Sequence, residues 1–371
     1  MKKKTPLKIT FVTPGMVWTP GGSYRVVYEY ANQLVSLGHQ VTIVHPLKAV
    51  KVPNSYQSLG RTVKEGLQFV RKFVKSARPK WFDLLPDVQV IKTTSLRIAA
   101  IRYSDILVAT NWSAAVPLYQ EALRVGIPMV QFVHHYEVLG GYPEDAVHQA
   151  LALPVPKVAV SRWTQKCLID KGFNQVFYIP NGIDHRRFRI IKPIEKRSMV
   201  VCFNYVPKKI KDPKTGIEAL VQAKQRFPEL KVILYGPVVK PPYLPFAFKY
   251  YSRVSDEILV KDIYNESAIF LSSSRIEGFS LPAAEAMACG CAVVATDSGG
   301  IRDFAIHNDT ALLSPPGDAD TLASHLIEAL YNKDLRIRLA SSATARIKTF
   351  RWEESAKQLE VLLYQCLNDH T

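Results

Sequence analysis

Apolar and polar positions alternate along this chain in two repeating arrangements. Short apolar runs, typical of buried strands, are separated by longer segments in which apolar residues recur every three to four positions, as on one face of a helix. The opening residues show one complete unit: a strand is expected at 7–13, a helix at 23–37 that Gly38 stops, and a second strand at 40–45. The pattern predicts a parallel sheet covered by helices.

The same alternation fills the first half of the chain. It predicts helices at 113–125 and 162–171, and strands at 88–92, 105–110, 128–133, 157–160 and 176–179. Residues 185–197 then lose the periodicity and become basic, so we place a linker between two domains there.

A second alternating series follows the linker. It predicts a Pro-rich loop at 237–245, strands at 199–203, 231–235, 268–271 and 291–296, and helices at 213–227, near 255–265, and at 318–332, 335–348 and 352–367. The predicted fold class is α/β, with two tandem Rossmann-like, doubly wound domains, residues 1–184 and 185–351, that face each other across a cleft. Sites in such folds lie at the C-terminal ends of the strands.

Length and composition agree with a two-domain globular protein. The chain has 371 residues, which exceeds one ordinary core, and 47% of them are hydrophobic. The apolar run at 9–12 is too short for a signal peptide, and no segment reaches the roughly 18 apolar residues of a membrane span. Five cysteines without a CxxC spacing indicate a reducing compartment rather than a disulfide framework or a zinc site. We expect a soluble, cytoplasmic protein.

The charge balance indicates an anionic partner. Lys and Arg number 48 against 32 acids, a net charge of +16, which suits nucleic acid, a phosphorylated small molecule or an anionic membrane surface. Many of the cations crowd residues 59–82, where apolar residues recur at helical spacing and Trp81 and Phe82 follow. This segment is either an amphipathic helix on the inner face of the cell membrane or a helix that packs on the core with a solvated basic face.

The most informative segment runs from a strand into a short helix. Glu277 lies in the loop after the strand at 268–271, and Glu285 lies about one turn inside the helix. Pro282 fits the first helical turn, so the amides of 278–281 and the helix N-terminus can face a phosphate with both carboxylates beside it. The alternative is that Glu285 only complements the helix dipole and Glu277 only solvates a loop.

Several motifs appear along the chain in a fixed order. They are Gly21-Gly22, Ile179-Pro180-Asn181-Gly182-Ile183-Asp184, Glu277-Gly278-Phe279-Ser280-Leu281-Pro282, Glu285-Ala286-Met287-Ala288-Cys289-Gly290, Ser298-Gly299-Gly300 and Phe350-x-Trp352-Glu353. Together they resemble the family four glycosyltransferases, which are retaining enzymes with nucleotide-sugar donors and the paired glutamates of Glu277-x7-Glu285. The resemblance implies the GT-B architecture, in which the last helix, 352–371, packs back on the first domain.

The resemblance also implies a role for each matched residue. Glu285 would bind the ribose hydroxyls of the donor, and Glu277 would contact the transferred sugar. The donor's sugar hydroxyls and diphosphate would be held by the amides of Gly278, Phe279, Ser280 and Leu281. Gly21 and Gly22 would let the backbone approach the diphosphate or the acceptor, and the alternative for such a pair is an ordinary turn before a helix.

A histidine follows the cleft-facing strand in this family, and here that strand leads into His134 and His135. We expect His134 to hydrogen-bond the donor sugar, which makes His134 and Glu277 the predicted catalytic pair. Strand alternation puts the two histidines on opposite sides, so at most one faces the cleft. A purely structural histidine is the alternative, and no third ligand is spaced to form a metal site with them.

The chain departs from the family where a cation is expected. The family commonly has an Arg and then a Lys after the first strand of the second domain, and both meet the donor diphosphate. Asn204 lies near the Arg position here. We choose Lys211 as the diphosphate ligand, directly before the Asp212 cap of the next helix, with Lys209 as the second choice.

The resemblance favours a metal-independent hexosyl transfer with retention from a UDP-glucose-like donor, without a cofactor. The acceptor is expected to be a growing exopolysaccharide or a lipid-linked saccharide. Two competing hypotheses stay open: a sugar epimerase or phosphorylase of the same fold, and a noncatalytic nucleic-acid binder. Against the second, the basic cluster contains no recognisable nucleic-acid module, so we expect no nucleic-acid partner.

Overall fold

The computed structural model describes residues 5–16, 20–47, 76–239 and 243–370. The chain divides into two compact units. The first comprises residues 1–160, 164–179 and 352–371, and the second comprises residues 161–163 and 180–351. Most of the basic segment at 59–82 lies outside the described residues.

The first unit is built on a seven-stranded sheet in which every pair of neighbours is parallel. The strand order is β3-β2-β1-β4-β5-β6-β7. Its strands are β1 (Lys8–Val12), β2 (Gln40–Pro46), β3 (Gln89–Thr93), β4 (Ile106–Ala109), β5 (Met129–Val133), β6 (Lys157–Ala159) and β7 (Val176–Tyr178). Its helices are α1 (Gly22–Ser36), α3 (Ala99–Arg102), α4 (Trp112–Val125), α5 (Glu144–Leu151), most of α6 (Arg162–Asp170) and α12 (Trp352–Asn368), with a short 3-10 turn, η2 (Glu137–Gly140).

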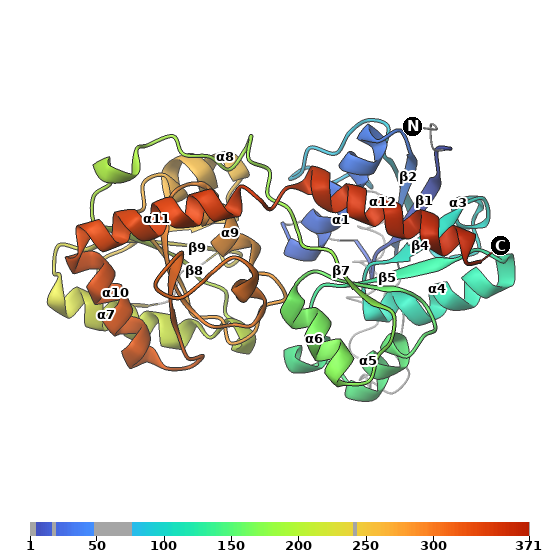
Figure 1. Cartoon of the computed structure of the whole chain (residues 1–371). Coiled ribbons are helices and arrows are strands. Elements are labelled where there is room, and N and C mark those ends of the chain that lie inside the picture. Colours follow the sequence, from blue (N-terminus) through green and yellow to red (C-terminus); the bar gives the residue numbers. More distant parts are fainter. Residues whose placement is uncertain (1–4, 17–19, 48–75, 240–242, 371) are drawn as a thin grey trace. The chain divides into compact units, whose positions relative to one another are not determined.

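Helix α12, the last of the chain, packs on α1 within the first unit (Figure 1). The ring of Trp352 meets the ring of Tyr30 edge-on with their centroids 5.3 Å apart. His39 Nε2 lies 3.1 Å from Glu360 Oε1. Apolar and polar contacts therefore both attach this helix to the first unit.

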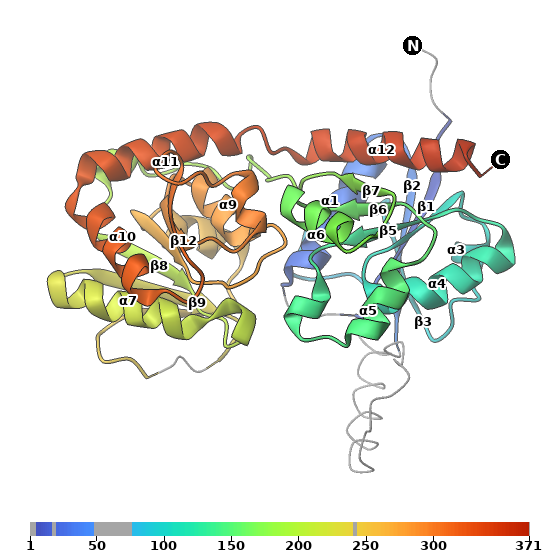
Figure 2. The same cartoon turned by 60° about the horizontal axis from the view of Figure 1, so that its bottom comes forward.

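The second unit is built on a six-stranded parallel sheet in the order β10-β9-β8-β11-β12-β13. Its strands are β8 (Val200–Asn204), β9 (Lys231–Gly236), β10 (Lys249–Ser252), β11 (Ile269–Ser272), β12 (Ala292–Thr296) and β13 (Ala311–Ser314). Its helices are α7 (Pro213–Arg226), α8 (Asp256–Ile258), the π-helical turn η5 (Leu259–Tyr264), α9 (Leu281–Ala288), α10 (Ala319–Tyr331) and α11 (Lys333–Ile347), with the 3-10 turns η3 (Ile194–Lys196), η4 (Lys209–Lys211) and η6 (Gly300–Asp303). Figure 2 shows α7 and α11 on opposite faces of this sheet.

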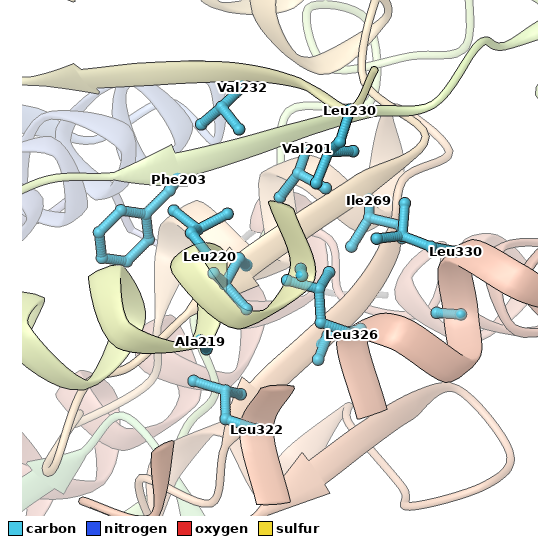
Figure 3. Packing of buried hydrophobic residues seen from close by; sticks show 14 of the residues in the cluster. Val201, Phe203, Ala219, Leu220, Leu230, Val232, Ile269, Leu322, Leu326 and Leu330 are labelled. Atoms are coloured by element: carbon cyan, nitrogen blue, oxygen red, sulfur yellow. The ribbon is translucent and has the colours of Figure 1, made fainter. Parts of the chain in front are cut away.

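One hydrophobic core of the second unit lies between this sheet and helices α7 and α10 (Figure 3). Val201 and Phe203, two positions apart on β8, both belong to it, as strand alternation requires. Helix α7 approaches β8 closely at Gly216, where an added Cβ would come within 2.5 Å of the Phe203 ring. The start of α7 is therefore held close to the end of β8.

The segment expected to be a linker, 185–197, belongs to the second unit. Its last residue, Arg197, is buried and donates hydrogen bonds to the carbonyls of Tyr264 at 3.2 Å and Ser267 at 2.9 Å. This guanidinium attaches the segment to η5 and to the residues just before β11, which fixes the end of this basic stretch.

The predicted α/β fold class with two parallel sheets is confirmed. Strands β10 and β13 and helices α3 and α5 were not predicted. The helix expected near 255–265 is a single α-helical turn followed by the π-helical η5. Among the described residues, no helix has both the length and the apolar character needed to cross a membrane.

Candidate active site

The backbone around Glu277, between β11 and α9, is held by a neighbouring loop. The Glu277 amide donates to the Ser298 carbonyl at 2.8 Å, and the Gly300 amide donates to the Glu277 carbonyl at 3.0 Å. A Cβ on Gly300 would lie 2.0 Å from the Gly278 carbonyl oxygen, so a larger residue could not allow this approach. The Ser298-Gly299-Gly300 motif therefore braces the loop that presents the Glu277 carboxylate.

The Glu277 carboxylate is paired with a predicted cation. Lys211 Nζ lies 2.6 Å from Glu277 Oε1, and Ser274 Oγ donates to the same oxygen at 2.8 Å. The Glu277 side chain is only 13% exposed, which shields the pair from solvent. An ammonium has three N–H donors, so Lys211 keeps two for a ligand. The structure thus brings together two predicted site residues and adds Ser274, which the sequence analysis missed.

Two helices begin beside this ion pair from left-handed backbone. Asp212, at the N-cap of α7, has φ 41°, and Ser280, at the N-cap of α9, has φ 73°. This conformation costs a non-glycine residue about 1–2 kcal/mol and is concentrated at functional sites. Neither side chain caps its helix, so the first-turn amides of α9, including that of Leu281, are not satisfied by a cap.

Asp212 occupies the predicted cap position, but its carboxylate has other partners. Its Oδ2 accepts a hydrogen bond from Thr215 Oγ1 at 2.9 Å and lies 2.8 Å from Arg275 Nε. Arg275 comes from the loop after β11 and was not predicted. Asn204, which lies near the family's Arg position, is the last residue of β8. An arginine is therefore present beside this helix start, although it comes from the loop after β11 and not from the end of β8.

Phe279 contributes its side chain to the interior rather than to the loop surface. Its ring is buried and lies 5.2 Å from the Phe304 ring and 5.9 Å from the Phe350 ring, centroid to centroid. A ligand at this loop would meet the Phe279 backbone, as the resemblance implies for its amide.

Glu285 is buried in α9 near two tyrosines that the sequence analysis missed. The Tyr235 and Tyr264 hydroxyls lie 2.8 Å apart, and Tyr264 donates to the Pro282 carbonyl at 3.2 Å. Burial raises the pKa of both tyrosines well above its usual value, and the Glu285 carboxylate acts in the same direction. Both phenols therefore stay protonated as donors beside this carboxylate.

The other predicted residues lie in the first unit, where His134 directly follows β5. His134 Nε2 is buried and has no hydrogen-bond partner among the described residues. Burial lowers the pKa of His134 to about 4, His135 acts in the same direction, and a backbone hydrogen bond at Thr110 opposes them. The ring is neutral at physiological pH and keeps one unused nitrogen.

Gly21 is the N-cap of α1, and Gly22 is the first residue of that helix. The Gly21 φ of −148° is extended backbone that any residue adopts. A Cβ there would meet only the Tyr24 ring, at 3.9 Å, among the described residues. The described residues of the first unit therefore leave room for a side chain at position 21. If glycine is required there, the reason would be a bound ligand that approaches the backbone.

A buried polar network, missed from the sequence, fixes the loop after β1. The Gly15 carbonyl accepts from Thr13 Oγ1 at 2.7 Å and from the Tyr24 hydroxyl at 2.8 Å. His45 Nδ1 lies 2.7 Å from Thr13 Oγ1, and burial lowers the pKa of His45 to about 4. This network joins Gly15 to Tyr24 in the first turns of α1.

Glu137, in η2 just after His134, was also missed from the sequence. Only 3% of it is exposed, and burial raises the pKa of Glu137 to about 8. Asn111 Nδ2, at the N-cap of α4, lies 3.5 Å from Glu137 Oε1, while Oε2 has no partner in the described part of the chain. The edge of the first sheet thus carries a buried, neutral carboxyl next to the neutral His134.

Two family models match the chain in succession. Glycosyltransferase Family 4 matches residues 20–187, and Glycosyl transferases group 1 matches residues 184–346. The chain belongs to the family 4 glycosyltransferases. The resemblance inferred from the paired-glutamate motif is thereby confirmed, and so is the expectation that the protein is a transferase of this kind.

Two curated relatives illustrate the range of this family. The glycosyltransferase is 23% identical to the phosphatidyl-myo-inositol mannosyltransferase of Mycolicibacterium smegmatis over 95% of this chain and 92% of the relative. It is 27% identical to the O-antigen chain mannosyltransferase B of Escherichia coli over 40% of this chain and 42% of the relative. The relatives thus act on different acceptors.

Solved structures match the glycosyltransferase over nearly its whole length. Anabaena HepE, in complex with UDP and glucose, is similar with a TM-score of 0.73 and 17% identity, covering 97% of this chain and 100% of that chain. The sucrose-phosphate synthase of Thermosynechococcus elongatus is similar with a TM-score of 0.72 and 18% identity, covering 97% and 99%. At these identities the likeness concerns the fold, which is the predicted GT-B fold.

Proposed function

We propose that this glycosyltransferase transfers a hexose from a nucleotide-diphosphate sugar to a saccharide or lipid-linked acceptor in polysaccharide biosynthesis. The observation that carries the proposal is the Lys211–Glu277 pair at the start of α9. It puts a cation, a carboxylate and uncapped helix amides in one loop cluster of the second unit. These are the groups that a sugar diphosphate needs.

Each group in the cluster has a distinct proposed task. Lys211 keeps its bond to Glu277 and turns its remaining N–H groups to the diphosphate, while Glu277 accepts from a hydroxyl of the transferred sugar. The amides of Gly278, Phe279, Ser280 and Leu281 hold the phosphate and sugar oxygens. Glu285 accepts from the ribose hydroxyls, and in the first unit His134 and the Gly21-Gly22 backbone serve the donor sugar and the diphosphate.

The proposed reaction retains the configuration at the anomeric carbon. The bond between that carbon and the diphosphate oxygen breaks, the acceptor oxygen bonds to the same face, and the acceptor proton passes to the departing diphosphate. Lys211 and the α9 amides stabilise the negative charge that develops on the leaving group, so this chain's own groups can act without a metal or a cofactor. No carboxylate forms a covalent bond to the sugar, in contrast to retaining hydrolases. A covalent sugar trapped on Glu277, or an inverted product, would contradict this route.

UDP-glucose is the favoured donor, supported by the likeness to HepE, whose structure contains UDP and glucose. A mannose donor is the second candidate, because two relatives are mannosyltransferases. The absence of the family's Arg at Asn204 is consistent with a donor preference that differs from most members.

The proposed acceptor chemistry follows the relatives' names, which include phosphatidyl-myo-inositol and an O-antigen chain. With such an acceptor, we propose that the enzyme works in the cytoplasm on the inner face of the cell membrane, and that the basic segment at 59–82 meets anionic lipid there. Removing the charges of Arg61, Lys64, Arg71 and Lys72 should weaken retention on vesicles that contain phosphatidylglycerol at low salt. If the variant binds the vesicles as well as the wild type does, this segment is not the part of the protein that meets the membrane.

A thermal-shift panel with UDP, GDP, ADP and dTDP tests the site and the donor together. One nucleotide should raise the Tm, and the shift should disappear in Glu285→Ala but persist in Glu328→Ala, an exposed glutamate on α10. Turnover of the donor without acceptor would favour an epimerase, and a requirement for inorganic phosphate would favour a phosphorylase. If no nucleotide shifts the Tm, the proposed donor site is wrong.

A further inference from the structure

A basic pocket opens on the second unit next to the start of α7. It has a volume of about 510 Å³ and is lined by Pro207, Lys208, Lys209, Asp212, Pro213, Lys214 and Arg275. Four of these seven side chains are cations and one is an acid. The volume suffices for a small ligand.

The single acid of the pocket is already neutralised. Asp212 Oδ2 lies 2.8 Å from Arg275 Nε and accepts from Thr215 Oγ1 at 2.9 Å. The Lys214 ammonium lies 3.7 Å from the carboxylate of the partly exposed Glu218. An exposed ion pair at this distance adds little to the stability of the protein. Lys208 and Lys209 have no acidic partner in the described part of the chain. The pocket therefore keeps a surplus of positive charge, because Asp212 is its only acid and is already paired with Arg275.

Arg275 is the one cation of the pocket whose position is fixed on several sides. Its amide donates to the Ile210 carbonyl at 2.8 Å, and its Nε pairs with Asp212. Its Nη2 lies against Gly317, where an added Cβ would come within 2.8 Å of that nitrogen. The planar guanidinium is thus oriented before any ligand arrives, and its terminal N–H groups have no acceptor among the described residues.

The pocket is separate from the proposed donor site. Neither Glu277, nor the loop at 278–281, nor Glu285 lines it. The turn η4 lies between them, because Lys211 extends to Glu277 while Lys208 and Lys209 line the pocket. Lys208 and Lys209 therefore line the pocket, while Lys211, from the same short turn, belongs to the proposed donor site.

We propose that this pocket is a second anion site that binds a phosphate or diphosphate group. Three ammonium groups and an oriented guanidinium provide many donors for a compact ligand that carries several oxygens and at least two negative charges. A carboxylate would neutralise only one of the four cations. The phosphate can belong to a free diphosphate or to the head group of an anionic lipid. The inference goes beyond the proposed donor site and does not depend on which nucleotide that site binds.

Calorimetric titration of the full chain with inorganic diphosphate tests the proposal, with and without saturating UDP so that binding at the donor motif is separated. The test variants are Lys208→Gln/Lys214→Gln and, separately, Arg275→Gln. The matched control is Lys333→Gln/Lys348→Gln, which removes the same two charges from the exposed surface of the second unit. A parallel arm measures sedimentation with phosphatidylcholine vesicles that contain or lack phosphatidylglycerol.

The pocket variants should weaken diphosphate binding at least about tenfold, since each charged hydrogen bond removed has an effect of that order. The control should bind as the wild type does, and the UDP-induced Tm shift should persist in the lysine variant. Binding of phosphatidylglycerol vesicles alone, lost only in the pocket variants, would support the site and identify lipid as the source of the phosphate.

Three results would overturn the proposal. The first is that neither diphosphate nor phosphatidylglycerol binds the wild type. The second is an equal loss in the control, which would show a general effect of net charge. The third is loss of the UDP shift in Lys208→Gln/Lys214→Gln, which would make the pocket part of the donor site. Because both lysines are exposed, that variant keeps the test valid even if Arg275→Gln fails to fold.

Discussion

The candidate site residues of the two units differ in how their polar groups are paired. In the second unit the charges near α9 already satisfy one another: Glu277 is bonded to Lys211 and Ser274, and Arg275 pairs with Asp212. In the first unit His134 Nε2 and Glu137 Oε2 are buried without partners among the described residues. A buried polar group without a hydrogen-bond partner lowers the stability of the folded protein by about 1–3 kcal/mol. A paired group is already held in position for a ligand. The comparison shows that the candidate site residues of the second unit are paired in advance, while those of the first unit keep unused hydrogen-bonding capacity.

The largest effect is expected where the second unit's pairing is broken. Lys211→Met and Glu277→Gln should each lower kcat by about 100- to 1000-fold, since each removes preorganised charge from the proposed transition state. The double variant should lose much less than the product of the two, because the side chains act as one unit. Steady-state kinetics on all four proteins, with Lys333→Gln as a control, measure this coupling. Independent, fully multiplicative losses would mean that the ion pair is incidental to catalysis.

A smaller effect is expected from loosening the brace behind Glu277. In Gly300→Ala the new methyl group would meet the Gly278 carbonyl oxygen, which lies 2.0 Å from the ideal Cβ position, so the backbone must shift. Overpacking of this kind should lower the Tm by about 5–10 °C. It should also reduce kcat, because the Glu277 loop moves.

The matched variant in the first unit is Gly21→Ala, where the methyl group has room. Its Tm should stay within about 2 °C of the wild type, while kcat/KM falls if a ligand approaches that backbone. Calorimetry and kinetics on Gly300→Ala and Gly21→Ala distinguish two reasons for a glycine. One is to avoid a steric clash within the chain, and the other is to let a ligand approach the backbone. A large loss of Tm in Gly21→Ala would contradict the assignment.

A separate effect, which depends on pH, is expected for the stability contribution of Glu137. Burial raises the pKa of this carboxyl to about 8 in the folded state, against about 4.3 in an unfolded chain. Because the folded state then binds the extra proton, the wild type loses stability as the pH rises between these two values. Glu137→Gln cannot ionise, so its Tm advantage should grow by at least about 3 °C from pH 5 to pH 8 and then level off.

His45 and His134 also titrate differently in the folded state, and burial lowers the pKa of each to about 4. They make folding less favourable as the pH falls below about 6.5, but they do so equally in the wild type and in Glu137→Gln. The difference between the two Tm curves therefore isolates Glu137. A difference that does not vary with pH would show that Glu137 is already ionised and paired in the folded protein.

The periodicity of the chain predicted most strands and the longer helices within a few residues, because these elements bury one continuous apolar face. It missed β10, whose four residues follow a Pro-rich loop, and β13, which is equally short. Both lie at the edges of the sheet, and their pairing there depends on a neighbouring strand rather than on a period of their own.

The motifs located the loop at Glu277 but could not show how its charges are paired. Lys211 and Glu277 are 66 positions apart, and their contact depends on β8 and β11 being neighbours in the sheet. The left-handed backbone at Asp212 and Ser280 left no trace in the sequence, because neither residue is a glycine. The buried state of Glu137 was equally hidden, since a lone glutamate after two histidines and a tyrosine gives no sign of its surroundings.

The return of α12 to the first unit determines the order in which the protein can be completed during translation. The second unit occupies the middle of the chain, so the ribosome releases all of it before the last helix of the first unit. Tyr30 and His39 gain their contacts with Trp352 and Glu360 only after the whole second unit has been synthesised. The first unit, which begins before the second in the chain, is therefore closed only after it, and its uncovered apolar surface is exposed to aggregation in the meantime.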